Sequence, residues 1–229
     1  MPLILNIDTA TEIATFCISK NESIIHFVVN DKQKEHSSFL QPAIKQLLKK
    51  SNVSIRQLDA VSVTAGPGSY TGLRVGMASA KGLCYALQIP LIALNTLEVM
   101  ALSVIEKTNE PELYVYCPMI DARRMEVFTA MFDDELNEIQ PPRALVLEPS
   151  SFDKAMHQKQ IIFSGSGSKK FATLSLHQSS FLFSDLTISA SALVKISTKK
   201  FKQQKFTELL NAAPAYIKEF YTVKKISAE

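Results

Sequence analysis

The chain has 229 residues, of which 46% are hydrophobic and 21% charged, so it has the size and composition of a globular protein with one or two domains. No apolar stretch reaches the roughly 18 residues of a membrane span, and the opening MPLILNIDTATE carries no basic leader, so we expect a cytoplasmic protein that contacts no membrane. The net charge of +3 is too small to indicate nucleic-acid binding by itself.

Short apolar or alternating runs predict three consecutive strands at the start of the chain, over 3–8, 12–19 and 23–29. Apolar residues at three- and four-residue spacing then predict an amphipathic helix over 36–50, in which Pro42 is tolerated only near the first turn. The pattern continues with a strand over 59–65, a helix over 69–87, a strand over 89–94 and a helix over 95–107. This order indicates an α/β protein with a mixed sheet.

After Pro111 the pattern of strands starts again. Strands are predicted over 112–120, 124–132, near 144–147 and over 160–164, and helices over 150–157 and 189–206. Each half places an acidic turn between two strands, Asp8-Thr9-Ala10 in the first and Asp121-Ala122-Arg123 in the second. This echo hints at a duplicated architecture. The last stretch, 222–229, has no apolar period and is expected to be loose.

Five of the seven glycines lie between positions 66 and 82. Gly66 and Gly68 join a predicted strand to a predicted helix, where α/β proteins often bind phosphate. A P-loop would need a lysine that is absent here, and the third glycine of a dinucleotide fingerprint is displaced to position 72. An anion site and a tight turn with glycine at positive φ both remain open.

The predicted helix over 69–87 is apolar on nearly all sides. Gly72, Gly76, Ala80 and Cys84 recur every four residues and form a ridge of small side chains, against which another backbone can pack closely. One sheet covers only one face of such a helix. The remaining faces are covered either by the 36–50 helix of the same chain or by another subunit, and the spacing leaves both open.

Catalytic side chains form no recognisable constellation. The four histidines make no HxxxH or HExxH pair, and the chain has no GxSxG elbow. Cys17, Cys84 and Cys117 lie far apart in apolar surroundings, which predicts buried, reduced thiols. Asp8, Glu12 and Asp121 stand at or beside predicted strand ends, where a carboxylate serves either acid/base chemistry or turn capping.

The run TAGPGSYTGLRVGMASAKGLCYALQIPLIALNTLE resembles the TsaB (YeaZ) family, bacterial partner proteins in the synthesis of threonylcarbamoyladenosine on tRNA. The resemblance extends upstream through LNIDTATEIATFCI and EHSSFLQPAIKQLL, and more loosely downstream through MIDARRMEVFTAMF and PAYIK. It implies the actin-like ATPase (sugar kinase and heat-shock chaperone) superfold, built from two RNase H-like subdomains of which the second is reduced. We place them at residues 1–97 and 98–229.

Catalytic relatives, the TsaD proteins, resemble the same segment and end it with two histidines that bind the metal. In this chain Asn95-Thr96-Leu97-Glu98-Val99-Met100 covers those positions, so Thr96 and Met100 stand where the ligands would be. A hydroxyl and a thioether replace two imidazoles poorly. The resemblance therefore implies a non-catalytic paralogue without catalytic residues, metal or cofactor, with ATP expected in the complex rather than in this chain.

The resemblance also implies a set of partners. It predicts a heterodimer with TsaD, a homodimer when the chain is alone, TsaE as a further ATPase subunit, and tRNA contact only through the complex. The expected role is to hold TsaD competent to transfer the threonylcarbamoyl group to the adenosine beside the anticodon. The contact is expected on the two helices of the first half, with no assignment of the outward face, at Phe39, Ala43, Leu47, Gly72, Gly76 and Ala80.

Two other functions stay open. The first is a nucleotide-binding ATPase or kinase that uses the cleft between the halves, with Asp8-Thr9 and Gly165-Ser166-Gly167 on its phosphate and adenosine sides. The second is direct tRNA binding by the lysine-rich stretch 189–206, whose lysines otherwise form a solvated helix face.

Overall fold

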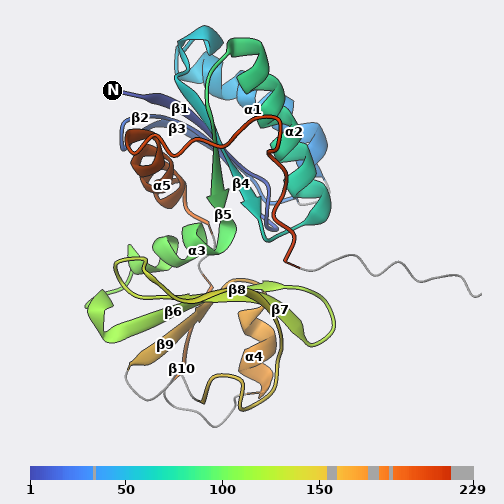
Figure 1. Cartoon of the computed structure of the whole chain (residues 1–229), viewed down its shortest axis with the longest axis vertical. Coiled ribbons are helices and arrows are strands. Elements are labelled where there is room, and N and C mark those ends of the chain that lie inside the picture. Colours follow the sequence, from blue (N-terminus) through green and yellow to red (C-terminus); the bar gives the residue numbers. More distant parts are fainter. Residues whose placement is uncertain (33–34, 154–158, 175–180, 186–187, 218–229) are drawn as a thin grey trace, which may run out of the picture.

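The computed structural model describes residues 1–32, 35–153, 159–174, 181–185 and 188–217. These residues form two five-stranded mixed sheets, one from each half of the chain, with two helices between them (Figure 1). The α/β class and the restart of the strand pattern after Pro111 are therefore confirmed.

The first sheet has the strand order β3-β2-β1-β4-β5. Strands β1 to β3 are antiparallel neighbours, whereas β4 and β5 run parallel to β1. Helices α1 and α2 pack on one face of this sheet, and their apolar sides close a core over it. The elements are β1 (Leu3–Asp8), β2 (Ala14–Lys20), β3 (Ser23–Asn30), α1 (His36–Lys50), β4 (Ala60–Gly66), α2 (Tyr70–Leu87) and β5 (Leu91–Asn95), with a 3₁₀ turn at Ile55–Gln57.

The second sheet has the order β10-β9-β6-β7-β8, which repeats the first when β6 is matched to β1. Asp8 ends β1 and Asp121 ends β6, so the two acidic turns are equivalent positions of a duplicated topology. The outer face carries the short helix α4. The elements are β6 (Tyr114–Asp121), β7 (Glu126–Phe132), β8 (Glu138–Val146), β9 (Gln160–Ser164), α4 (Ser168–Leu174) and β10 (Phe181–Ser184), with a 3₁₀ turn at Pro111–Leu113.

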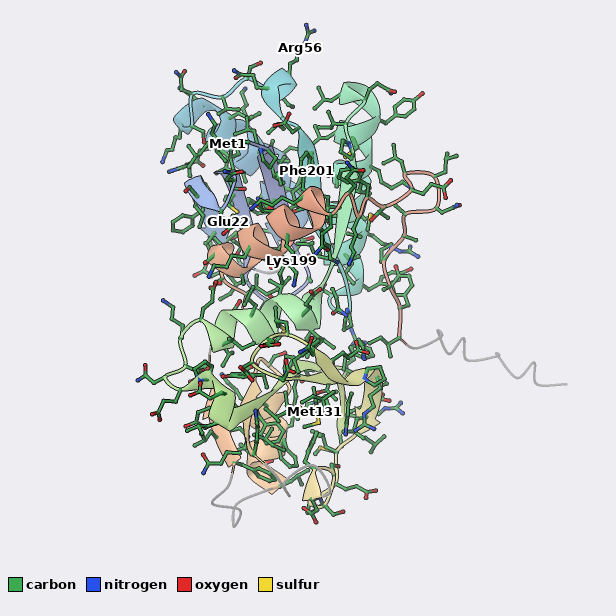
Figure 2. The ribbon with its side chains drawn as sticks, turned by 60° about the vertical axis from the view of Figure 1, so that its left-hand side comes forward. Met1, Glu22, Arg56, Met131, Lys199 and Phe201 are labelled. Atoms are coloured by element: carbon green, nitrogen blue, oxygen red, sulfur yellow. The ribbon has the colours of Figure 1, made fainter. Side chains whose placement is uncertain are left out.

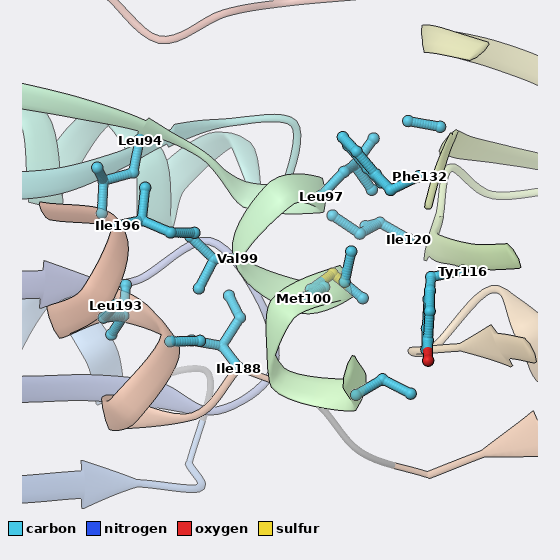
Figure 3. Packing of buried hydrophobic residues seen from close by; sticks show 14 of the residues in the cluster. Leu94, Leu97, Val99, Met100, Tyr116, Ile120, Phe132, Ile188, Leu193 and Ile196 are labelled. Atoms are coloured by element: carbon cyan, nitrogen blue, oxygen red, sulfur yellow. The ribbon is translucent and has the colours of Figure 1, made fainter. Parts of the chain in front are cut away.

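Helices α3 (Thr96–Ile105) and α5 (Ala190–Lys202) lie between the sheets. Helix α3 follows the first sheet in the chain but packs on β6 and β7, whereas α5 follows the second sheet and packs on the first. Their side chains join one apolar cluster, in which Met100, Ile120 and Ile196 come from three different elements (Figure 3). The halves are therefore joined by a continuous core, and the boundary at residue 97 stays a prediction.

The predicted helices and strands of the first half are confirmed to within two residues at nearly every end. The expectation for Pro42 is wrong, because six helical residues precede it in α1. The lysine-rich helix ends at Lys202 rather than at position 206. Strand β10 was not predicted, since its four residues carry no alternating pattern long enough to read.

Of the helix predicted over 150–157, residues 150–152 form turns and residue 153 has 3₁₀ conformation, whereas positions 154–158 lie outside the described residues, so this helix stays a prediction. The predicted loose stretch 222–229 also lies outside them. Within the described residues, no helix combines the length and the apolar character needed to cross a bilayer.

Candidate functional site

The turn between β4 and α2 packs directly on the loop between β1 and β2. Gly66 has φ +124°, and a β-carbon on Gly68 or Gly72 would collide with the backbone carbonyl of Ala10 or Thr9. The backbone N–H of Ser69 donates to the Ala10 carbonyl at 2.7 Å. The glycines therefore allow the turn to pack closely on this loop. The carbonyl oxygens of Thr9 and Ala10 would repel an anion at the place where a phosphate loop binds one.

The small-residue ridge of α2 faces into the protein. A β-carbon on Gly76 would collide with the Thr9 hydroxyl, and Ala80 and Cys84 are buried in the first core. Ala43 and Leu47 of α1 are fully buried in the same core. These side chains are therefore not available to a partner, and the predicted contact through Ala43, Leu47, Gly72, Gly76 and Ala80 is corrected: the chain's own sheet and loop cover them.

Phe39 differs from the other predicted contacts because it is only half-buried, with its ring 6.1 Å from that of Phe16. Its contact with a partner stays a prediction.

The exposed side of α2 is a different stripe, which we call the outer α2 face. It consists of small and apolar side chains, of which Tyr85 is 71% exposed. A β-carbon on Gly82 would meet nothing within 4 Å. Sequence reasoning missed this face because α2 is apolar all round, so the pattern alone could not show which side the sheet covers. The face comprises Ala78, Gly82, Tyr85 and Ala86, with the half-buried Val75 and Ser79 at its edge.

A C-terminal strap, residues 207–217, returns from α5 to the first half and runs beside α2 (Figure 1). Lys81 donates through Nζ to the carbonyls of Leu210 at 3.3 Å and Ala212 at 2.9 Å. The Ala215 N–H donates to the Ala65 carbonyl at 2.6 Å. The strap therefore ends at the carboxyl end of β4, beside the gap between the halves.

That gap is a cleft of about 1140 Å³ lined by both halves. Its walls come from the β1–β2 loop, the β4–α2 turn, the β6–β7 turn and the end of the strap. Of the residues assigned to a nucleotide by the ATPase hypothesis, Ser166 lines the cleft, and its hydroxyl accepts from the Asp121 N–H at 3.1 Å. The flanking glycines serve packing instead, since a β-carbon on Gly165 would collide with the Met100 methyl group.

Asp8 lies fully buried at the end of β1. Its Oδ1 accepts from the Thr64 hydroxyl at 2.7 Å and from the Ala10 N–H at 3.0 Å, whereas Oδ2 has no partner among the described residues. Burial raises the pKa of this carboxyl to about 6, against the lowering effect of the two hydrogen bonds. The neighbouring Thr9 hydroxyl donates to the Gly72 carbonyl at 2.7 Å, so both side chains are engaged inside the fold.

The positions that the resemblance assigns to metal ligands lie in the core between the sheets. Thr96 is fully buried and its Oγ1 has no hydrogen-bond partner among the described residues. Met100 is buried one turn later, and its methyl group fills the space beside Gly165. A hydroxyl and a thioether in an apolar cluster do not suit a metal that prefers imidazole ligands. No group of three or more His, Cys, Asp or Glu side chains suited to a metal occurs within the described ranges.

The three cysteines are buried free thiols, as predicted. Burial raises the pKa of Cys17 and of Cys117 to about 12, so neither forms a thiolate near neutral pH.

The lysines of α5 are largely ion-paired within the chain. Lys195 lies 2.8 Å from Glu106, and Lys202 lies 2.9 Å from Glu22. Lys199 has no carboxylate partner in the described part of the chain. It lies on α5 (Figure 2) and is not among the residues that line the cleft. This pattern favours a solvated helix face over an RNA-binding surface.

Known proteins resemble this chain over most of its length. The family described as TsaD, tRNA N6-adenosine threonylcarbamoyltransferase, matches residues 25–228. The tRNA threonylcarbamoyladenosine biosynthesis protein TsaB of Buchnera aphidicola is 30% identical over 137 residues, which are 60% of each chain. The protein of the same name from Escherichia coli is 28% identical over 231 residues, which are 97% of each chain.

Solved structures share the fold. YeaZ from Pseudomonas aeruginosa is 23% identical and superposes with a TM-score of 0.79, covering 94% of this chain and all of that one. A second Pseudomonas aeruginosa structure, of a protein similar to YeaZ, is 22% identical with a TM-score of 0.83 over 95% of this chain and all of that one. With the duplicated sheets, these likenesses confirm the predicted actin-like superfold of two RNase H-like subdomains.

Proposed function

The chain belongs to the tRNA N6-adenosine threonylcarbamoyltransferase (TsaD) family, and from this premise we propose that it is a non-catalytic partner of a catalytic TsaD subunit. Its similarity to proteins named for tRNA threonylcarbamoyladenosine biosynthesis supports a role in that pathway. In the complex it holds TsaD competent to transfer the threonylcarbamoyl group to the adenosine beside the anticodon. TsaE, an ATPase, joins the same complex.

The observation that carries this proposal is the filled core at Thr96 and Met100. Both side chains are buried, Met100 belongs to the apolar cluster between the sheets, and its methyl group packs against Gly165 from the other half. A metal and a substrate would need open space and polar ligands at this point. The family's scaffold is therefore retained while its metal position serves packing.

The outer α2 face supports a role in binding another protein. Ala78 and Gly82 leave the helix backbone open to close approach, and Tyr85 beside them offers a large exposed ring. Small residues flanked by an aromatic anchor suit helix-to-helix contact. The partner on this face is TsaD in the working complex and a second copy when the chain is alone.

The test is capture of the TsaD protein from the same cell by the full chain. Ala78→Arg places a long cation on the outer α2 face at an exposed position, so the fold should persist while capture of TsaD falls at least tenfold. Ile139→Arg is the matched control, because Ile139 is 50% exposed on β8 in the other half. If the wild-type chain does not capture TsaD, the proposal fails. If both variants capture TsaD equally, only this placement of the contact fails.

A nucleotide-binding ATPase remains the second candidate, and the volume of the cleft is the observation that favours it. The buried Asp8 and the engaged Thr9 weaken it, because neither side chain lines the cleft. Calorimetry of the isolated chain with ATP and magnesium separates the two functions. Micromolar binding together with turnover would replace the non-catalytic assignment.

A further inference from the structure

The arginines of this chain differ from its lysines in their ion pairing. Seven lysines form ion pairs with described carboxylates, whereas none of the five arginines does. Three of these arginines gather at the mouth of the cleft. Arg123 and Arg124 line it from the β6–β7 turn, both exposed and both at positive φ, and Arg74 lies across the gap on α2.

Two tyrosines stand at the same mouth. Tyr70 and Tyr216 line the cleft, each 41% exposed, with ring centroids 5.6 Å apart. Arg74 lies with its guanidinium carbon 4.0 Å from the Tyr70 ring centroid and donates through Nε to the Tyr216 hydroxyl at 3.0 Å. These contacts join the two rings and the guanidinium group into an aromatic ledge, while each tyrosine stays partly open to solvent.

The acidic groups of the cleft are Glu12, Asp121 and Glu126. Asp121 is engaged, since its Oδ1 accepts from Lys170 Nζ at 2.6 Å and from the Arg123 N–H at 2.6 Å. Glu12 and Glu126 repel a polyanion from the walls that they occupy. A phosphate chain is therefore favoured at the arginines of the mouth rather than deep in the cleft.

We propose that this tyrosine–arginine mouth binds an unpaired stretch of RNA, with a base stacked on the tyrosine ledge and backbone phosphates held by Arg123 and Arg124. Exposed aromatic rings beside arginines are the combination that binds single strands, because stacking needs a free base face and guanidinium groups pair with phosphate. The inference rests on the proposed function, which brings tRNA to the complex. It assigns to this chain a direct contact with the RNA.

A free nucleotide is the other ligand that carries both a base and phosphate groups. The interior of the cleft argues against it, because Gly68 and Gly72 pack against the carbonyls of Ala10 and Thr9, and the Ser69 N–H already donates to the Ala10 carbonyl. Arg123 and Arg124, which have no carboxylate partner among the described residues, stand at the exposed mouth, where an RNA strand would pass, and not at the end of an enclosed pocket.

The first experiment measures RNA affinity of the full chain, alone and with its TsaD partner, against a fluorescent RNA hairpin with a single-stranded loop and a blunt duplex of equal length. The double variant Arg123→Ala/Arg124→Ala should bind the hairpin at least tenfold more weakly and show a smaller dependence on salt. Arg56→Ala/Arg143→Ala removes the same charge elsewhere, and Arg56 stands at the far end of the first half (Figure 2), so its affinity should change less than twofold.

The second experiment separates stacking from the hydrogen bond. Tyr216→Phe loses the bond to Arg74 but keeps the ring, whereas Tyr216→Ala loses both. We expect Phe to retain hairpin affinity within twofold and Ala to lose about tenfold. Equal losses in the two variants would show that Tyr216 acts through Arg74 and would overturn the stacking assignment.

Three results overturn the inference: equal weakening by the two arginine pairs, equal affinity for hairpin and duplex, or ATP binding that depends on Arg123 and Arg124 while hairpin binding does not. Size-exclusion chromatography of the same samples reports TsaD association independently. If the chain does not associate with TsaD, the proposed function fails but the RNA result still stands. If association is normal and Arg123→Ala/Arg124→Ala binds the hairpin as tightly as wild type does, only the inference fails.

Discussion

The Thr9 hydroxyl donates to the Gly72 carbonyl at 2.7 Å, so the loop after β1 is bonded directly to the first turn of α2. The same loop is held from α1, where His36 Nε2 lies 3.2 Å from the Thr11 carbonyl. Both long helices of the first half therefore contact a loop that lines the cleft. A partner that moves α1 or α2 would move this wall of the cleft with them.

The first prediction compares two glycines of α2. Gly76→Ala places a β-carbon against the Thr9 hydroxyl, which its bond to Gly72 prevents from moving away, so unfolding free energy should fall by about 1–3 kcal/mol. Gly82→Ala meets open space and gains helix propensity, so stability should rise by about 0.5–1 kcal/mol. Urea unfolding of both variants tests the pair, and a destabilised Gly82→Ala would contradict it.

A larger side chain at Gly76 has no space to enter. The position is buried, and Thr9 and Val63 lie against it. Gly76→Arg should therefore unfold the chain, so loss of a partner in that variant would say nothing about an interface.

Asp8 makes stability depend on pH. Its folded pKa of about 6 lies above the ordinary 3.8, so the folded chain binds the proton more tightly than the unfolded chain does. Stability from this group is therefore fully present below about pH 4, falls as the pH rises to about 6 and stays lower above that, by about 3 kcal/mol in total.

Asp8→Asn removes this titration while its side-chain oxygen can still accept from Thr64 and Ala10. The difference in unfolding free energy between Asp8→Asn and wild type, measured from pH 4 to 7, should grow in favour of the variant as the pH rises. A difference that stays constant over this range would contradict the assignment.

Local patterns predicted the elements well because their causes are local. The alternation in β1 to β3 and the spacing of Leu40, Ile44 and Leu47 in α1 are visible in a few neighbouring residues. The direction of the small-residue ridge depends instead on the contact of Gly72 and Gly76 with Thr9, more than sixty positions away. No pattern within α2 contains that information.

The contacts at the cleft could not be predicted for the same reason, because they join residues far apart in the sequence. Tyr70 and Arg74 belong to α2, but their partner Tyr216 reaches them only because the strap returns past α2. The loosely matching PAYIK was the one signal at that point of the sequence, and nothing in it indicated a contact with Arg74. The acidic turns at Asp8 and Asp121 were placed correctly because each follows a clear strand.

Lys81 should hold the C-terminal strap against α2. Lys81→Met keeps the aliphatic stem but loses the bonds to the Leu210 and Ala212 carbonyls. We expect amide hydrogen exchange at Ala215, whose N–H is bonded to Ala65, to quicken about tenfold. Lys199→Met is the control, since Lys199 is exposed on α5. Equal exchange at Ala215 in both variants would show that the strap is held by other contacts.

The last prediction concerns the filled metal position. Thr96→His/Met100→His restores two imidazoles one helical turn apart on α3, but both positions are buried and Met100 lies in the apolar cluster between the sheets. The core must expand and bury polar nitrogens, so the unfolding free energy should fall by about 3–5 kcal/mol. The single variant Met100→Leu keeps the apolar volume and should cost less than about 1.5 kcal/mol.

Titrating the Thr96→His/Met100→His variant with zinc tests whether these two positions can still form a metal site. A metal that binds the folded double variant would raise its stability in proportion to the logarithm of the metal concentration. We expect no such rise, because no described cluster of three ligand side chains surrounds these positions to complete the coordination. Stabilisation that grows with zinc, confirmed by stoichiometric metal in the purified variant, would show that the scaffold still holds the geometry of a catalytic site.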